Sequence, residues 1–261
     1  MGGRCHRWRG RHRRDRGGRR LTPAGHGAPA CADRFAISLR PGMSRPFVLE
    51  NSVTEMIPPF LIVGLGNPGA EYAATRHNVG FMAIDRLAAR LAAGPWESRW
   101  RGWAATVTLE GRAGWLLKPA TYMNRSGLAV AAAVAATNTP VERICVLHDD
   151  LDLACGRLKV SYDRGHGGHN GVRSIIEHLD SRGFARVRIG IGRPLPEVDV
   201  VTHVLGDFAP EEQRQIGDLL SLAAEAAIAC VVHGAAAAMS RFNASAPAGA
   251  PLLPQEKNPS P

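Results

Sequence analysis

The body of the chain alternates continuous apolar runs with segments of helical periodicity. Residues 60–65, FLIVGL, form an apolar run of strand length, and residues 144–152, ICVLHDDLD, form another that ends in acidic side chains. Unbroken runs of this kind are typical of strands buried on both faces. Residues 79–93 instead repeat apolar positions at helical spacing, with Asn78 standing where a helix cap is expected.

Shorter segments continue the alternation toward the C-terminus. The pattern predicts strands at 103–109, 114–118, 157–162 and 186–191, and helices at 127–137, 171–180 and 209–232. Alternating strands and helices predict an α/β fold: a single domain with a mixed, largely buried central sheet flanked by helices. We place this domain at residues 56–243, between a disordered Arg-rich extension over 1–55 and a disordered tail over 244–261.

The positive charge lies mostly outside that domain. The 261-residue chain has 32 basic and 23 acidic residues, a net charge of +9. Residues 1–55 hold twelve Arg and four acidic residues, or +8, so the rest carries only +1. Residues 1–20 lack apolar periodicity, and no apolar run of a secretory signal follows their charges. It is open to three interpretations: a prefix upstream of a true start at Met43 or Met56, an arm that attracts nucleic acid, or a targeting segment.

Composition argues against several classes of protein. The five Cys are scattered without a CxxC pair, which disfavours a disulfide framework or structural zinc site and suits a reducing cytosol. The Ala-rich run over 226–240 is too weakly apolar to predict a membrane span. The chain has no GxSxG motif, so a serine hydrolase is disfavoured.

A glycine pattern follows the first predicted strand. Gly64, Gly66 and Gly69 match the GxGxxG pattern of dinucleotide sites. Pro68 interrupts the loop, however, and the acid about twenty residues on, Asp85, lies in a predicted helix rather than at the end of a second strand. A tight turn that needs glycine backbone freedom is therefore the favoured interpretation.

Two titratable residues are candidates for catalysis. His77 precedes the predicted helix, and Asp149 ends a buried strand, where α/β sheets place their sites. A carboxylate bonded to one imidazole nitrogen would fix the tautomer and direct the other nitrogen toward water. From spacing alone, a solvated His and an acidic loop after the strand are the favoured interpretation.

Further candidates gather in a glycine-dense loop. Residues 165–171 carry four glycines around His166, His169 and Asn170, which suits close approach of backbone to a ligand but also a flexible hairpin tip. A metal-hydrolase site would draw on these His and the acids of 148–152, yet no recognised ligand spacing is present.

Four blocks in order resemble bacterial peptidyl-tRNA hydrolases. They are FLIVGLGNPGAEYAATRHNVGFMAIDRLA (60–88), KPATYMNRSG (118–127), HDDLDLACGRLKV (148–160) and GHGGHNGVRSI (165–175), followed by RVRIGIGRP (186–194). The resemblance spans about 58–243. It implies an enzyme that hydrolyses the ester between a peptide and the terminal ribose of tRNA, releasing free tRNA for reuse in translation.

The resemblance also assigns roles to individual residues. His77 would be the general base on water, Asp149 would orient it, and Asn67 would help to recognise N-blocked substrates. The other substrate-binding positions implied are Tyr72, Tyr122, Asn124, His169 and Asn170, and those for tRNA phosphates are Lys159 and Arg188. The resemblance implies no metal or organic cofactor and no membrane. It implies a cytoplasmic monomer that acts on peptidyl-tRNA released from ribosomes.

The chain departs from the family pattern at two positions. Ser161 stands where some members have a second basic residue after Lys159, and Arg125 replaces a commoner aliphatic residue. Residues 156–193 nevertheless hold eight basic and three acidic groups, a local charge of +5 that could follow acceptor-stem phosphates. Alternatives for the function are an RNA-binding protein on the same fold with little catalysis, or a dinucleotide-dependent oxidoreductase.

Overall fold

The structure, a computed structural model, describes residues 58–244. The predicted extension over 1–55 and, except for Ala244, the predicted tail lie outside the described residues. The strands are β1 Phe60–Gly64, β2 Glu97–Arg99, β3 Gly102–Leu109, β4 Arg112–Pro119, β5 Ile144–Asp150, β6 Leu158–Tyr162 and β7 Ala185–Gly190. The helices are α1 Val79–Arg90, α2 Ser126–Thr137, α3 Asn170–Leu179, α4 Val200–Leu205, α5 Pro210–Val232 and α6 Ala235–Ala244. Short 3-10 turns are η1 Ala70–Tyr72, η2 Arg76–Asn78, η3 Met123–Arg125 and η4 Val141–Arg143.

The strands form one mixed sheet in the order β2-β3-β4-β1-β5-β7-β6. Strands β4, β1, β5 and β7 run parallel to one another, and β2, β3 and β6 join antiparallel to their neighbours. At the centre, Ile62 of β1 is in register with Leu116 of β4 and Cys145 of β5. The predicted fold class is confirmed.

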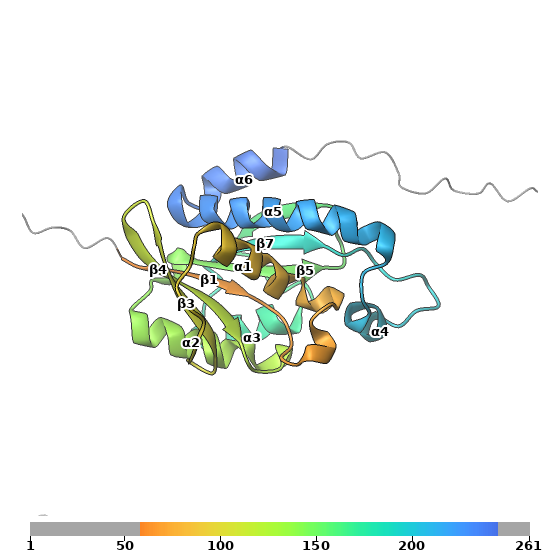
Figure 1. Ribbon diagram of the computed structural model, residues 1–261, viewed down its shortest axis with the longest axis horizontal. Helices are drawn as coiled ribbons and strands as arrows, with labels where there is room; N and C mark the ends of the chain where they lie inside the picture. Colours follow the sequence, from red (N-terminus) through yellow and green to blue (C-terminus); the bar gives the residue numbers. More distant parts are fainter. Residues whose placement is uncertain (1–57, 245–261) are drawn as a thin grey trace, which may run out of the picture. The chain divides into compact units, whose positions relative to one another are not determined.

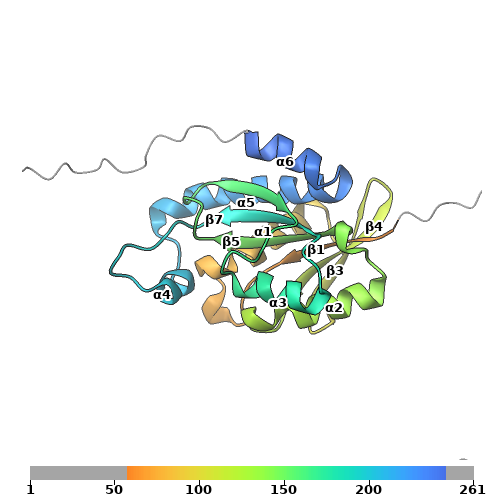
Figure 2. The same ribbon diagram turned by 180° about the vertical axis from the view of Figure 1, so that it is seen from behind.

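Helices cover both faces of the sheet. Figures 1 and 2 show α1, α5 and α6 on one face and α2 and α3 on the other. Successive side chains of β1 point to opposite faces of the sheet, which explains the two layers. Phe60 and Ile62 join the core under α1 and α5, while Leu61 and Val63 join the core against α2 and α3. Because both faces are covered, this strand requires an unbroken apolar run.

Among the strands and α-helices, three elements were not predicted, and each lacks a clear apolar pattern. All three residues of β2 are exposed, α4 is only six residues long, and α6 buries only Ala238 and Phe242 among its ten residues.

Helix α5 is long enough to cross a membrane, with a mean hydropathy of 1.6, and 56% of its most apolar window is buried inside the protein. That burial places its apolar face over the sheet, as in a core helix.

The glycines after β1 serve close packing. A Cβ on Gly64 would lie 2.4 Å from the carbonyl oxygen of Gly80 in α1, and one on Gly66 would lie 2.7 Å from the ring of Phe81. Of the three glycines in the GxGxxG match, only Gly69 has a positive φ, 119°. The prediction of a turn that needs glycine freedom is therefore wrong for Gly64 and Gly66, where α1 approaches the strand too closely for a side chain.

Candidate active site

The loop after β1 is fixed by a reciprocal pair of asparagines. The Asn67 N–H donates to Asn78 Oδ1 at 2.8 Å, and Asn78 Nδ2 donates back to the Asn67 carbonyl at 2.9 Å. Asn78 precedes α1 as predicted, but its side chain makes no capping bond to that helix. Asn67 Oδ1 accepts the Met123 N–H at 2.9 Å, so the Asn67 amide has one orientation and its Nδ2 group has no partner among the described residues.

His77 meets the carboxylate at the end of β5. Its Nδ1 lies 2.9 Å from Asp149 Oδ1, although 71 residues separate the two along the chain. Parallel β1 and β5 bring their carboxyl ends to one edge of the sheet, where the loop before α1 also lies. With Nδ1–H donating to Asp149, the lone pair of His77 is on Nε2, and the side chain lines a cavity.

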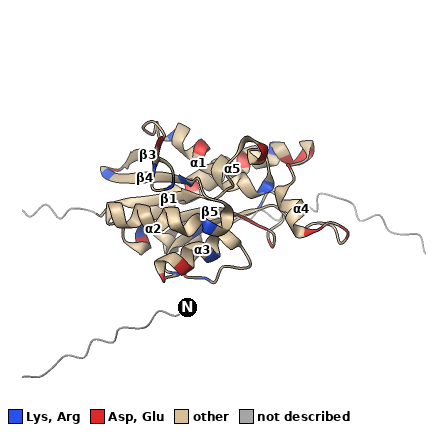
Figure 3. Ribbon diagram, turned by 90° about the horizontal axis from the view of Figure 1, so that it is seen from below, with Lys and Arg blue, Asp and Glu red and all other residues tan. Residues whose placement is uncertain are grey.

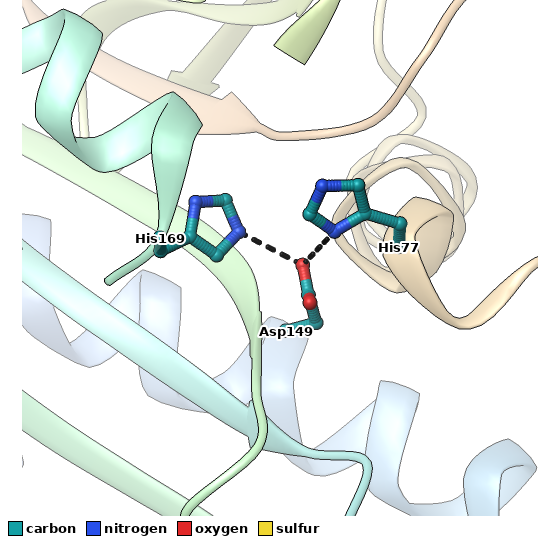
Figure 4. Close-up of side chains that lie close together, drawn as sticks. All are labelled: His77, Asp149 and His169. Carbon is teal, nitrogen blue, oxygen red and sulfur yellow. Dashed lines mark hydrogen bonds and ion pairs between the residues drawn. The ribbon is translucent and has the colours of Figure 1, made fainter. Parts of the chain in front are cut away.

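His169 is a third member of this group. Its Nε2 lies 2.8 Å from the same Asp149 Oδ1 (Figure 4). Its Nδ1 accepts the N–H groups of Gly171 and Val172 at 3.1 and 3.3 Å. Since Nδ1 accepts, the proton must be on Nε2, which donates to Asp149. The His169 imidazole therefore both caps the N-terminus of α3 and binds the Asp149 carboxylate.

The surroundings keep Asp149 ionised. Burial by itself would raise the pKa of Asp149, but His169 and His77, by charge and hydrogen bonding, hold it well below its usual value. His148 lies on the other side, with its ring edge-on to that of His169 at 4.7 Å and its Nδ1 donating to the Asp149 carbonyl at 2.7 Å. Burial, with His169 next, lowers the pKa of His148 well below its usual value. The His148 imidazole is thus neutral beside the anionic Asp149 carboxylate.

A cavity of about 650 Å³ opens beside these residues. Its wall includes His77, Asp149 and His169, the glycine loop over 165–168, and basic groups from β6 and β7. The loop starts at a fixed point, because Arg186 Nη1 donates to the Gly165 carbonyl at 2.8 Å. Burial lowers the pKa of Arg186 to about 10. The cavity therefore joins the His–Asp–His group to a positively charged wall.

Of the other predicted substrate-binding residues, the cavity is lined by Asn170 alone. Asn170 is the first residue of α3 and lines the cavity. Asn124, in η3, and Tyr122, with 62% of its surface exposed, stand near Met123, whose N–H binds Asn67. Tyr72 ends η1, where it is half-buried. None of Asn67, Tyr72, Tyr122 or Asn124 lines the cavity itself.

The two predicted phosphate ligands differ in their availability. Lys159 is exposed at the cavity, and no described residue pairs with it. Arg188 also lines the cavity, but its Nε is hydrogen-bonded to Asp150 Oδ2. Arg193 is similarly bonded to Asp152, so acids that follow Asp149 neutralise part of the basic segment. Figure 3 shows basic and acidic residues interspersed over the described elements.

The histidine–aspartate group could in principle be a cation site, since its ligand atoms lie within 4.8 Å of one another. The proton on His169 Nε2 argues otherwise: that nitrogen donates to Asp149 because Nδ1 is already engaged by two N–H donors. The acids of the alternative cluster, Asp150 and Asp152, are paired with arginines. These contacts suit a proton-sharing network better than a metal centre.

Comparisons with known proteins agree with this geometry. The sequence profile of the family Peptidyl-tRNA hydrolase matches residues 61–249. The "Peptidyl-tRNA hydrolase" of Syntrophotalea carbinolica is 43% identical over 183 residues, covering 70% of this chain and 96% of the relative. That of a Synechococcus species is 47% identical over 189 residues, covering 70% of this chain and 82% of the relative.

Solved structures show the same fold. The crystal structure of peptidyl-tRNA hydrolase from Acinetobacter baumannii matches with a TM-score of 0.67 at 38% identity, covering 71% of this chain and 95% of that one. The sequence similarity and the shared fold extend over the whole sheet and its helices. The chain belongs to the peptidyl-tRNA hydrolase family and is an enzyme of that class.

Proposed function

We propose that the chain hydrolyses the ester between the peptide and the terminal ribose of peptidyl-tRNA with His77 as the general base. The observation that carries this proposal is the 2.9 Å contact from His77 Nδ1 to the buried Asp149, which leaves the Nε2 lone pair to accept a proton from water. Imidazole suits this task because its ordinary pKa lies near neutrality.

The reaction then needs few groups. As water attacks the ester carbonyl, its proton passes to His77 Nε2, and the Asp149 carboxylate stabilises the imidazolium that forms. The tetrahedral intermediate collapses by breaking the bond from carbon to the ribose oxygen, which takes the proton back from His77. His169 supports this step from the other side by holding Asp149 Oδ1 in place at 2.8 Å.

Uncharged amides bind the acyl side of the substrate in this proposal. Asn67 Nδ2 is the donor that the Met123 contact leaves available, Asn170 is exposed and lines the cavity, and Asn124 is exposed in η3. Amides recognise a peptide backbone whatever its side chains, and they stabilise an oxyanion without adding charge. We assign Tyr72 and Tyr122 to the terminal nucleotide, and Lys159 with Arg188 to phosphates of the tRNA.

The wider setting follows from the substrate. We infer a cytoplasmic monomer that acts on peptidyl-tRNA released from ribosomes, with no organic cofactor, metal or membrane partner. Residues 56–243 would form the catalytic domain, and residues 1–55 and 244–261 would lie outside it. The domain carries little net charge, but two of its basic side chains, Lys159 and Arg164, are exposed at the cavity.

Steady-state hydrolysis of N-acetyl-aminoacyl-tRNA tests the proposal. His77→Ala should lower kcat by about 100- to 10,000-fold, the range of a general base, while tRNA binding survives. His233→Ala is the matched control, because His233 is exposed at the end of α5. A His77→Ala enzyme with near wild-type kcat would refute the mechanism, and wild-type enzyme that binds tRNA without hydrolysis would favour an RNA-binding protein.

A further inference from the structure

The turn that carries His77 is joined to a segment more than 120 residues away. Thr75 forms an isolated antiparallel bridge with Asp207, and the Arg76 N–H donates to the Gly206 carbonyl at 2.9 Å. Residues 206–207 connect α4 to α5. The backbone before His77 is thus paired with the junction of these two helices.

The Arg76 side chain strengthens the same connection. Its Nη1 donates to the Asp207 carbonyl and its Nη2 to Glu212 Oε2, both at 2.6 Å. The guanidinium also lies over the Phe208 ring, 5.4 Å from its centroid. The Arg76 side chain is 13% exposed and that of Glu212 27%, so solvent screens this ion pair less than it screens a pair on the open surface. One residue therefore holds two acceptors and an aromatic face in a single fixed geometry.

Glu212 links this contact to a rigid element. The oxygen that accepts from Arg76 also accepts the Ala209 N–H at 2.8 Å, which satisfies a donor at the start of the 23-residue α5. Helix α5 packs across β5 and β7 and under α6. Helix α4 ends at the same junction, and its Val200, Val201 and Val204 line the cavity.

We propose that Arg76 is a positioning residue for His77, acting through Glu212 and the junction of α4 and α5. The inference rests on the proposed role of His77 as general base. Asp149 fixes only the ring of His77, through Nδ1. The backbone is a 3-10 turn of three residues without a side-chain cap, and such a turn has few internal hydrogen bonds to hold itself. Its backbone pairing reaches only residues 206–207, and the Arg76 side chain adds the contacts that tie the turn to Glu212 of α5.

Loss of this constraint should appear in the chemical step. A displacement of about 1 Å at the reacting atoms can cost about 100-fold in rate, without any change in the groups that bind substrate. Arg76→Met should therefore lower kcat for N-acetyl-aminoacyl-tRNA by about 100-fold while KM changes little. Arg76→Lys keeps the charge but not the two-pronged geometry, and its kcat should fall between those of the wild type and Arg76→Met.

A second ion pair provides the matched control. Arg90 and Glu225 join α1 to α5 at 2.9 Å, but both side chains are substantially exposed and neither lines the cavity beside His77. Arg90→Met should leave kcat and KM at wild-type values. The double variant Arg76→Met/Glu212→Gln should lose no more activity than Arg76→Met, because the contact that both changes affect is already broken. Losses that multiply would overturn the route through Glu212.

The outcomes separate this inference from the proposed function. If His77→Ala is inactive and folded Arg76→Met has wild-type kcat, the inference is overturned and the general-base role stands. If His77→Ala is active, the general-base role fails, and the inference with it. Should Arg76→Met not fold, Arg76→Lys decides: a lower kcat at an unchanged unfolding temperature supports the inference, and wild-type kcat overturns it.

Discussion

Replacement of Asp149 by Asn removes one negative charge and almost no volume. Asp149 Oδ1 accepts hydrogen bonds from both His77 and His169, at 2.9 and 2.8 Å, and an amide oxygen can still accept them. The change therefore isolates charge from shape. In the proposed mechanism, His77 carries the proton taken from water in the transition state, and the Asp149 carboxylate is the charge that faces it.

The size of the effect on kcat follows from the negative charge that the substitution removes. Two opposite unit charges about 4 Å apart interact by about 4 kcal/mol at the effective dielectric of a partly buried site. Since about 1.4 kcal/mol corresponds to a tenfold change in rate, Asp149→Asn should lower kcat by about 1,000-fold. Initial rates on N-acetyl-aminoacyl-tRNA measure this loss. Asp218→Asn, at an exposed position of α5, is the matched control.

The pH profile gives a second readout for the same variant. The histidines hold the pKa of Asp149 well below its usual value, so wild-type enzyme keeps the carboxylate ionised throughout the working range. Without this negative charge, protonation of the neighbouring imidazoles becomes less favourable, and the acid limb of the rate profile should move to lower pH. A kcat within a few-fold of wild type, or an unmoved acid limb, would refute the pairing of Asp149 with His77.

Three further outcomes are expected. Because the pKa of His148 is lowered in the folded protein, His148 takes up a proton on unfolding when the pH is below the ordinary imidazole pKa. The wild type should therefore lose about 1.4 kcal/mol of unfolding free energy per pH unit from this group as pH falls below about 6.5. Urea unfolding of His148→Asn should lack this slope, and equal slopes would contradict a neutral His148. Saturating EDTA should leave hydrolysis unchanged, and strong inhibition that added metal reverses would revive a metal centre at His77, Asp149 and His169. A chain that begins at Met56 should keep wild-type kcat and tRNA affinity, and a large loss of affinity would give the basic residues of 1–55 a role in binding.

The sequence predicts best where one face or both faces of an element are buried. The unbroken run of β1 and the helical spacing of α1 were predicted because burial dictates their residues. Exposed β2 and short α4 carry no such constraint. Asn78 shows a different limit: an Asn before a helix can bond to that helix or to a distant loop, and only the fold shows that Asn67 is its partner.

The geometry of the site was partly accessible from sequence. Strand ends made a contact between His77 and Asp149 possible, but only the resemblance to the family led us to expect it, and the two side chains do meet. The double role of His169 was missed, since an imidazole is not an ordinary N-cap and nothing in GHGGHNG indicates that its other nitrogen reaches Asp149. Its assignment to substrate binding remains a prediction.

Charge counts along the chain overstated the free positive charge near the site. Residues 156–193 carry a formal +5, but Arg188 and Arg193 are paired with Asp150 and Asp152, which lie outside that segment. The pairs form because β5, where the acids begin, lies beside β7 in the sheet. The overall +9 is a still weaker guide, since eight of these charges belong to residues 1–55.

Chemical rescue tests the central claim most directly. Single-turnover hydrolysis of N-acetyl-aminoacyl-tRNA by His77→Ala should be slower than wild type by at least about 100-fold, and added imidazole should restore part of the rate in proportion to its unprotonated form. Imidazole should not accelerate the wild type or Asp149→Asn in the same way. A His77→Ala enzyme that hydrolyses its substrate at the wild-type rate without imidazole would contradict the account.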